Sequence, residues 1–320
     1  MAEPLLEVKG LTKHFTIRRG MFGKEKVVRA VDGVNLTIYP GETVGIVGES
    51  GCGKTTTGRC ILRLMEPTDG EILFQGRDIR RLNGADLRKI RRDLQLVFQD
   101  PFASLNPRKT VGQILEDPLA VHGIGTVAER RRMVEEMIEI VGIARQQLSR
   151  FPHEFSGGQR QRIGIARALI LRPKLIVADE PVSALDVSIQ AQILNLMQDL
   201  QKAFSLTYLF ISHDLSVVRH ICDRVAVMYL GKVVEVADKK KLYEQPAHPY
   251  TQALLSAVPV PDPGRQTQRI ILEGDLPSPA DPPLGCSFHP RCRSCLDVCK
   301  TSAPAWKECA DGHWVSCHLV

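Results

Sequence analysis

Thr43-Val-Gly-Ile-Val-Gly-Glu-Ser-Gly-Cys-Gly-Lys-Thr-Thr56 is an apolar strand that runs directly into a glycine-rich turn and then into a helix. The spacing Gly48-x-x-x-x-Gly53-Lys54-Thr55 is that of a phosphate-binding loop. Its glycines let backbone N–H groups turn toward phosphate oxygens, the helix adds its positive N-terminus, Lys54 adds a charge, and Thr55 offers a hydroxyl to Mg²⁺. The alternative is an ordinary strand-to-helix turn. The residues expected to hold a nucleotide are Gly48, Glu49, Ser50, Gly51, Cys52, Gly53, Lys54, Thr55 and Thr56.

The run Leu175-Ile-Val-Ala-Asp179-Glu180 places two carboxylates at the end of a second apolar strand. A parallel sheet gathers its ligand-binding groups at that end of its strands. We expect Asp179 to reach a bound Mg²⁺ and Glu180 to orient and deprotonate an attacking water. The alternative is that the two carboxylates only cap a helix.

Ser156-Gly157-Gly158-Gln159-Arg160 opens a helix. Ser156 and Gln159 have the spacing of a capping box, and the two glycines expose the N-terminal amides. Such a helix end is suited to holding an anion. An isolated Ser-Gly-Gly-Gln is more simply an ordinary capped helix, and its position ahead of Asp179 is what favours the functional interpretation.

Apolar strands that alternate with helices predict an α/β fold with a mostly parallel sheet. These strands are residues 43–47, 175–178 and 207–211. Two earlier runs, Leu5 to Val8 and Val34 to Ile38, predict an antiparallel edge sheet with a long hairpin loop from Arg18 to Arg29.

A small helical subdomain is predicted over residues 101–161, approximately. Thr126 and Glu129 form a capping box, and Gly142 closes the helix that follows. The apolar residues at helical spacing in it are Met133, Met137 and Val141. A later helix is expected to have one apolar face made of Leu185, Ile189, Ile193, Leu196 and Leu200.

Composition and charge do not decide the function. The 320 residues are 43% apolar, and the net charge of +6 gives weak grounds for binding nucleic acid or a membrane. No stretch is long and apolar enough to predict a transmembrane helix, and residues 1–10 lack the pattern of a secretory signal. We therefore expect a globular protein of the cytoplasm.

Further motifs follow the phosphate loop in the order and spacing of the ABC ATPase family, which this chain resembles. They are Gln99 after the strand 94–98, Ser156-Gly-Gly-Gln, Asp179-Glu180, Ser183-Ala-Leu-Asp186 and His213. The resemblance implies ATP and Mg²⁺ as cofactors, with the metal bound through Thr55, Gln99 and Asp179. It also implies that Glu180, His213 and Gln99 are the catalytic residues, with His213 on the γ-phosphate.

The family forms a nucleotide sandwich dimer, in which the signature Ser156-Gly157-Gly158-Gln159 of one cassette covers the ATP of the other. Asp186 occupies the family's D-loop. Phe15 matches the position where the family stacks an aromatic ring on adenine, although Phe22 lies nearby.

Longer strings resemble one branch, the oligopeptide, dipeptide and nickel importers. They are Val97-Phe-Gln-Asp-Pro-Phe-Ala-Ser-Leu-Asn-Pro-Arg108, Pro152-His-Glu-Phe-Ser-Gly-Gly-Gln-Arg-Gln-Arg162, His248-Pro-Tyr-Thr251 and Gly285-Cys-Ser-Phe-His-Pro-Arg-Cys292. The string Gly51 to Arg59 is most similar to the second of the two sibling ATPase subunits in a peptide importer. The implied function is to energise peptide import, with nickel or another small solute as the alternative cargo.

The resemblance also implies partners and a location. The expected partners are a sibling ATPase, two transmembrane permeases and an extracytoplasmic substrate-binding protein, and no nucleic acid. We expect this chain to lie at the cytoplasmic face of the inner membrane. A soluble ABC ATPase acting on nucleic acid or ribosomes is the rival from another class. It would need a long coiled coil or a second cassette, and the sequence contains neither. A nucleotide-binding regulator without turnover is disfavoured by the presence of both Glu180 and His213.

We predict a cassette over residues 1–245 and a Pro- and Cys-rich extension over 246–320. Six cysteines crowd this extension: Cys286, Cys292, Cys295, Cys299, Cys309 and Cys317. The family's four tail cysteines fall on Cys286, Cys292, Cys299 and Cys317, which in some members hold a [4Fe–4S] cluster. Zinc and free thiols remain alternatives. Arg293 and Cys295 depart from the family pattern of Pro and Ala.

Overall fold

The computed structural model describes residues 3–18, 25–258 and 269–320, apart from the side chains of Arg18, Pro101 and Ala103. Phe22 lies outside the described residues. Contacts divide the chain into two compact units. The first unit comprises Met1–Ile38, Thr43–Arg80 and Ser212–Val320, and the second comprises Tyr39–Glu42 and Arg81–Ile211.

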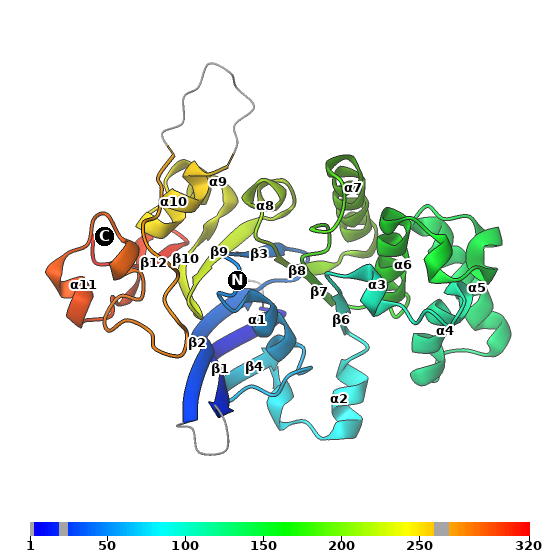
Figure 1. The fold of residues 1–320 in the computed structure, drawn as a ribbon. Helices are drawn as coiled ribbons and strands as arrows, with labels where there is room; N and C mark the ends of the chain where they lie inside the picture. The colour runs from blue at the N-terminus through cyan, green and yellow to red at the C-terminus, as the bar shows by residue number, and fades with distance from the viewer. Residues whose placement is uncertain (1–2, 19–24, 259–268) are drawn as a thin grey trace. The chain divides into compact units, whose positions relative to one another are not determined.

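An antiparallel sheet with the strand order β2-β1-β4-β5 forms one part of the first unit (Figure 1). Its strands are β1 (Leu6–Arg18), β2 (Glu25–Ile38), β4 (Asp69–Phe74) and β5 (Arg77–Asp78). Leu6 pairs with Ile38 and Phe15 with Val28, so the expected antiparallel edge sheet is confirmed. The hairpin loop was predicted too long, because residues 25–29 continue β2 instead of belonging to the loop.

A second sheet of the first unit has the order β11-β12-β10-β9-β3. Its strands are β3 (Thr43–Val47), β9 (Arg224–Tyr229), β10 (Lys232–Asp238), β11 (Trp306–Ala310) and β12 (His313–Ser316). β3 and β9 run parallel, whereas β9, β10, β12 and β11 are joined antiparallel. The helices of this unit are α1 (Lys54–Ile61), α8 (Leu215–Ile221), α9 (Lys239–Glu244), α10 (Pro249–Ser256), η4 (His289–Arg291) and α11 (Asp297–Thr301).

The C-terminal extension is built into this second sheet. β12 pairs with β10 through Glu235 opposite Val315 and Val236 opposite Trp314, as Figure 1 shows at the red end of the chain. Phe288 is 2% exposed and packs against the rings of Tyr229 and Tyr250. The extension therefore shares a core with the strand β9, instead of hanging from the unit as a loose tail.

The second unit contains three parallel strands in the order β8-β7-β6, which are buried except at the half-buried Gln95. They are β6 (Leu94–Val97), β7 (Leu175–Asp179) and β8 (Thr207–Ile211), which confirms parallel pairing of the strands 175–178 and 207–211. The helices are α2 (Gly84–Ile90), α3 (Pro101–Ser104), α4 (Val111–Val121), α5 (Val127–Ile140), α6 (Gly157–Leu169) and α7 (Val187–Phe204). Two short 3₁₀ turns, η2 (Arg145–Ser149) and η3 (Pro152–Glu154), also belong to this unit, whereas η1 (Ile79–Arg81) lies where the chain passes from the first unit to the second.

Both predicted capping boxes are present. Thr126 and Glu129 cap α5, and Ser156 and Gln159 cap α6, each with reciprocal side-chain and backbone hydrogen bonds. The buried face of α7 differs from the prediction, because Leu185 precedes the helix. The residues that α7 buries are Ile193, Leu194, Met197 and Leu200.

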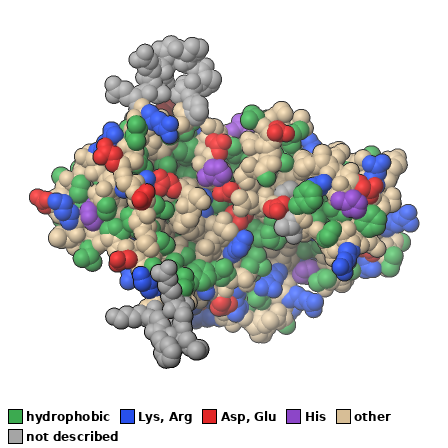
Figure 2. All heavy atoms as spheres, in the orientation of Figure 1, with side chains coloured by type: hydrophobic (Ala, Val, Ile, Leu, Met, Phe, Trp, Pro, Cys, Tyr) green, Lys and Arg blue, Asp and Glu red, His purple; other side chains and the backbone are tan. Residues whose placement is uncertain are grey.

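Charged side chains of both signs are mixed on the surface. On the face shown in Figure 2, lysine and arginine are interspersed with aspartate and glutamate. In the described part of the chain, no helix has both the length and the apolar character that crossing a bilayer requires.

Candidate nucleotide site

The phosphate-loop sequence forms a tight turn between β3 and α1 that only glycine permits at two positions. Gly48 has φ 152° and Gly53 has φ 106°, both in the region that L-residues rarely adopt. A Cβ at Gly48 would lie 2.1 Å from the carbonyl oxygen of Met228, and a Cβ at Gly53 would lie 2.1 Å from that of Ala30. Both glycines are therefore required by the backbone packed around the loop.

Lys54 lies inside this turn. Its side chain is 5% exposed, and its Nζ donates to the carbonyl oxygens of Gly48 at 2.8 Å and Glu49 at 3.0 Å. These bonds hold an ammonium charge at the N-terminus of α1, where the helix dipole also favours an anion. The arrangement fits a phosphate group, since an anion there would meet both the charge and the helix amides.

Two of the predicted catalytic residues are in contact within the second unit. Gln99 Nε2 donates to Glu180 Oε2 at 3.0 Å. Asp179, 3% exposed, is the last residue of β7, and Glu180 follows it with φ 46°. A glutamate in the left-handed region is strained, and such strain persists only where surrounding structure enforces it. Here the Glu180 N–H donates to the carbonyl oxygen of Ile211 at 2.9 Å.

The signature glycines have different surroundings. A Cβ on Gly158 would lie 2.5 Å from Cγ2 of Ile189, whereas a Cβ on Gly157 would lie 3.4 Å from Leu185. Gly158 is therefore required by the packing of α6 on the segment that starts α7, independently of any anion. Asp186 is the N-cap residue of α7, without a side-chain capping hydrogen bond.

The predicted site residues are divided between the two units. The first unit carries Phe15, the phosphate loop and His213, and the second carries Gln99, the signature, Asp179, Glu180 and Asp186. Phe15 is half-buried on β1, and Lys13 Nζ lies 5.0 Å from its ring centroid. His213 is exposed between β8 and α8.

The sequence analysis did not identify two residues that touch the phosphate loop. Arg291 in η4 forms two hydrogen bonds with the carboxylate of Glu49, at 2.7 and 3.2 Å. The Glu49 N–H donates to Tyr250 Oη at 2.9 Å. Both residues lie in strings that resemble the importer branch. That resemblance marked them as typical of the branch, but it did not indicate a contact with the phosphate loop.

The tail thiols are neighbours. Burial raises the pKa of Cys286 to about 11, and the nearby thiols of Cys299, Cys317 and Cys292 add to the rise. Burial likewise raises the pKa of Cys292 and of Cys317. Thiols with raised pKa values are protonated at neutral pH, whereas a metal binds thiolates.

These thiols do not form a coordination sphere as they are arranged. Within residues 3–18, 25–258 and 269–320, no group of three or more His, Cys, Asp or Glu side chains is placed to hold a metal ion. The iron–sulfur and metal-binding expectation is therefore not supported by this geometry.

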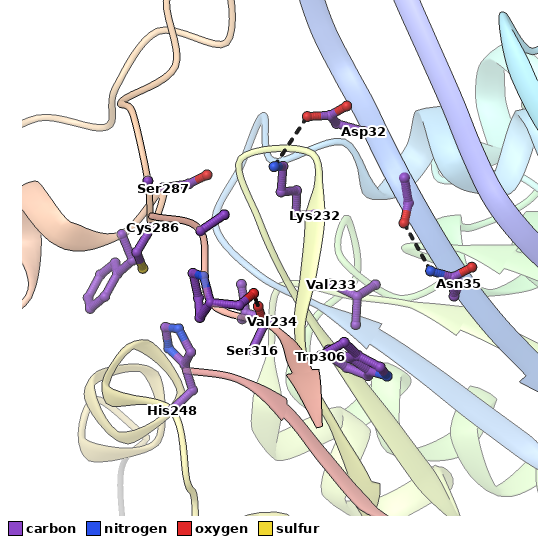
Figure 3. A pocket seen from close by; sticks show the side chains of 15 residues that line it. Asp32, Asn35, Lys232, Val233, Val234, His248, Cys286, Ser287, Trp306 and Ser316 are labelled. Carbon is purple, nitrogen blue, oxygen red and sulfur yellow. Dashed lines mark hydrogen bonds and ion pairs between the residues drawn. The ribbon is translucent and has the colours of Figure 1, made fainter. Parts of the chain in front are cut away.

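A cavity of about 360 Å³ lies elsewhere in the first unit and shares no lining residue with the phosphate loop. Figure 3 shows residues of β2, β10 and the extension around it, including Asn35 and Trp306 and an ion pair of 3.5 Å between Lys232 and Asp32. His248 is 1% exposed there, and its Nε2 has no hydrogen-bond partner in the described part of the chain. This cavity is thus separate from the phosphate loop.

Comparisons with known proteins agree with the motifs. The family model "ABC transporter" matches residues 31–183, and "Oligopeptide/dipeptide transporter, C-terminal region" matches residues 234–299. The oligopeptide transport ATP-binding protein AppF of Bacillus subtilis is 59% identical over 99% of this chain and 98% of its own. A putative peptide import ATP-binding protein of Brucella ovis is 55% identical over 98% and 97%.

Solved structures give the same result. The dimeric, post-hydrolysis ATP-binding cassette MJ0796 bound to ADP and Pi is 33% identical, with a TM-score of 0.65, covering 73% of this chain and 98% of that one. CbiO1 of Clostridium perfringens, part of the transporter complex cbiONQ, is 29% identical with a TM-score of 0.65, covering 76% and 92%.

The fold and the motifs together define a P-loop ATPase with mixed α/β sheets. The chain belongs to the family of ABC transporter ATP-binding proteins, and within it to the relatives of the oligopeptide and peptide import subunits. The expected family and ATPase class are confirmed, and so is the ABC ATPase part of the expected fold.

Proposed function

We propose that this chain binds and hydrolyses ATP to energise an importer of dipeptides or oligopeptides. The observation that carries the proposal is a match over nearly the full length of relatives named for peptide transport, including the C-terminal region at residues 234–299. Nickel or another small solute is the alternative cargo, because that region is common to a branch and not to one cargo.

The loop residues Gly48, Glu49, Ser50, Gly51, Cys52, Gly53, Lys54, Thr55 and Thr56 bind the phosphates in this proposal, and Phe15 contacts the adenine. The geometry in support is the charge of Lys54 at the first turn of α1, held by two loop carbonyls. Thr55, Gln99 and Asp179 hold Mg²⁺. The chemistry that the ion supplies is neutralisation of charge on the phosphate oxygens.

Glu180 is the general base that orients and deprotonates the attacking water, and His213 contacts the γ-phosphate. The hydrogen bond from Gln99 to Glu180 supports the assignment of Glu180, because it fixes the carboxylate while leaving it able to accept a proton. General-base catalysis contributes roughly a hundredfold to ten-thousandfold in rate.

The signature Ser156, Gly157, Gly158 and Gln159 and the D-loop residue Asp186 act on the ATP of a second cassette. The N-terminus of α6 presents backbone amides that the capping box leaves available at its first positions. We propose a sibling ATPase as the partner and place this chain at the cytoplasmic face of the inner membrane. The further partners are two permeases and an extracytoplasmic binding protein. The cassette spans residues 1–245, with a helical subdomain at about 101–161, and the extension spans 246–320.

The thiols of Cys286, Cys292, Cys299 and Cys317 are the proposed ligands of a [4Fe–4S] cluster, as in some members of the family. Their mutual proximity favours the proposal, whereas the raised pKa values of Cys286, Cys292 and Cys317 oppose it. Zinc and free thiols are the alternatives that metal analysis distinguishes.

The test is ATP hydrolysis and solute uptake by the complete transporter in proteoliposomes. We expect peptide-loaded binding protein to stimulate both activities, and Lys54→Ala to abolish ATP binding and uptake together. Stimulation by nickel and not by peptides would show that the alternative cargo is the correct one. Hydrolysis that responds to nucleic acid or ribosomes, and not to the permeases, would overturn the proposal.

A further inference from the structure

Glu49 is the second residue of the phosphate loop, and its carboxylate is held by the cysteine-rich extension. Arg291 Nη1 lies 2.7 Å from Glu49 Oε2, and Nη2 lies 3.2 Å from Oε1, which is a bidentate pair. The Arg291 side chain is 9% exposed and that of Glu49 is 27% exposed. Because bidentate, charge-assisted bonds are strong and directional, they fix the position of the loop relative to η4.

The backbone of Glu49 is held as well. Its N–H donates to the hydroxyl of Tyr250, a completely buried residue of α10, at 2.9 Å. Its carbonyl oxygen accepts from Lys54 Nζ at 3.0 Å. Thus the amide, the carbonyl and the carboxylate of one loop residue are all engaged, two of them by residues that follow the predicted cassette.

Arg291 and Tyr250 are themselves fixed by one aromatic cluster. Phe288, three residues before Arg291, packs against Tyr250 with 5.4 Å between ring centroids, and Tyr250 packs edge-on against Tyr229 at 4.7 Å. Glu49 raises the pKa of Arg291 through their hydrogen bonds, so the guanidinium keeps its charge at every working pH. A displacement of η4 would therefore carry a charged partner away from the loop.

We propose that Arg291 and Tyr250 are positioning residues for the phosphate loop, so that the folded state of the cysteine-rich extension sets the affinity for nucleotide. The inference rests on the proposed function, in which residues 48–56 hold ATP. Since coupling between two sites is reciprocal, ATP that orders the loop also orders the segment around Arg291. Cys286 and Cys292 lie on either side of this arginine in the sequence. A reaction at either thiol that displaced Arg291 would therefore also change the position of the loop.

The first experiment measures equilibrium binding of Mg-ATP to the full-length chain with Arg291→Met. We expect affinity to fall on the order of tenfold, because a truncated partner leaves Glu49 without its charge-assisted bonds. Arg293→Met is the matched control, since Arg293 in the same segment donates to the carbonyl oxygen of Ile271 instead. Arg291→Lys should recover part of the loss, because lysine keeps the charge without the fork.

A second pair of variants tests the backbone contact. Tyr250→Phe removes the acceptor of the Glu49 N–H, whereas Tyr208→Phe removes a buried hydroxyl that donates to the carbonyl oxygen of Met197 instead. The two changes are chemically identical. We expect weaker ATP binding from Tyr250→Phe alone.

Hydrogen exchange provides a readout that a purely structural role would not change. In the wild type and in Arg293→Met, Mg-ATP should slow amide exchange across residues 286–292, and in Arg291→Met it should not. Unchanged ATP affinity in Arg291→Met would overturn the inference. So would an amide exchange rate of residues 286–292 in the wild type that is the same with and without Mg-ATP. Lys54→Ala separates the two levels: if it weakens ATP binding while Arg291→Met does not, only this inference fails. If the wild type binds no ATP, the proposed function fails with it.

Discussion

His313 Nε2 and Glu235 Oε1 lie 2.7 Å apart, and their side chains are only 5% and 0% exposed. The Glu235 carboxylate also accepts from the N–H groups of Ala247 at 2.7 Å and His248 at 2.9 Å. One buried carboxylate on β10 therefore receives donors from β12 and from the start of the extension. A buried carboxylate with this many partners anchors both segments to the sheet.

Glu235→Ala should destabilise the protein strongly. It leaves the Ala247 and His248 amides and the His313 ring without their acceptor, and breaking a buried network of this kind costs about 3 to 5 kcal/mol. Denaturant unfolding of the full chain measures the change. The matched control is Glu308→Ala on the exposed strand β11, for which we expect about 0.5 kcal/mol or less. Equal effects of the two substitutions would contradict the anchoring role.

Glu180→Gln should still bind ATP and lose most turnover. The amide keeps the shape of the side chain and its oxygen can still accept from Gln99, but it cannot take a proton from water. Turnover should fall about a hundredfold or more in an ATPase assay, with ATP affinity within about twofold of the wild type. Near-normal hydrolysis would remove Glu180 from the role of general base.

Gly158→Ala should destabilise the second unit, because its methyl group would overlap Ile189 Cγ2. Ile189→Ala makes room for that methyl group, so the double variant should regain part of the stability that Gly158→Ala loses, relative to Ile189→Ala alone. Thermal unfolding of the four proteins forms a double-mutant cycle. If ATPase activity recovers together with stability, the glycine serves packing; if activity stays low, the signature also needs the bare backbone.

His248 should make stability depend on pH. Burial lowers its pKa from 6.5 to about 4, so the folded protein holds it neutral while the unfolded chain protonates it below about 6.5. Its stabilising contribution is therefore full above pH 6.5 and is lost as the pH falls toward 4. In the wild type, His248 Nδ1 accepts a hydrogen bond from the Tyr250 N–H. His248→Asn retains a side-chain oxygen that can accept this bond.

Denaturant midpoints between pH 4 and 7 check this prediction. We expect a smaller loss of stability on acidification in His248→Asn than in the wild type. The same substitution at His220, exposed on α8, is the matched control. An unchanged profile in His248→Asn would mean that other groups produce the acid sensitivity.

Metal analysis of anaerobically purified protein tests the tail. A [4Fe–4S] site predicts iron and sulfide near about four each per chain, and a zinc site predicts a single zinc. Cys292→Ser should release the metal, whereas Cys309→Ser, on an exposed strand, and Cys295→Ser should retain it. The reverse pattern would make Cys295 a ligand, and the absence of both metals would leave free thiols.

Local features of the fold were predictable because their causes are local. The capping boxes at Thr126 and Ser156 depend on residues three positions apart, and the parallel strands at 175–178 and 207–211 are continuous apolar runs. The loop from Arg18 to Arg29 was overestimated because its basic and polar residues mask a strand. Antiparallel pairing of β2 with β1 continues through residues 25–29. These residues are a strand because β1 pairs with them, which their own composition does not indicate.

Parts of the site could be predicted only as a set of motifs. Gln99 and Glu180 were each assigned a role, yet their hydrogen bond joins residues far apart in the chain. The contact of Arg291 with Glu49 depends on how the extension folds back, which no spacing encodes. For the same reason, the necessity of Gly158 became visible only when Ile189 was placed beside it.

The pairing of β12 with β10 also decides where the sheet ends. Without the extension, β10 would present a row of unpaired N–H and C=O groups, which other chains can extend into shared sheets. With it, the boundary passes to β11, where every residue is exposed and two neighbours, Lys307 and Glu308, are charged. Charged residues on an edge strand discourage strand addition. The extension thus covers the edge of β10 and leaves a charged edge strand in its place.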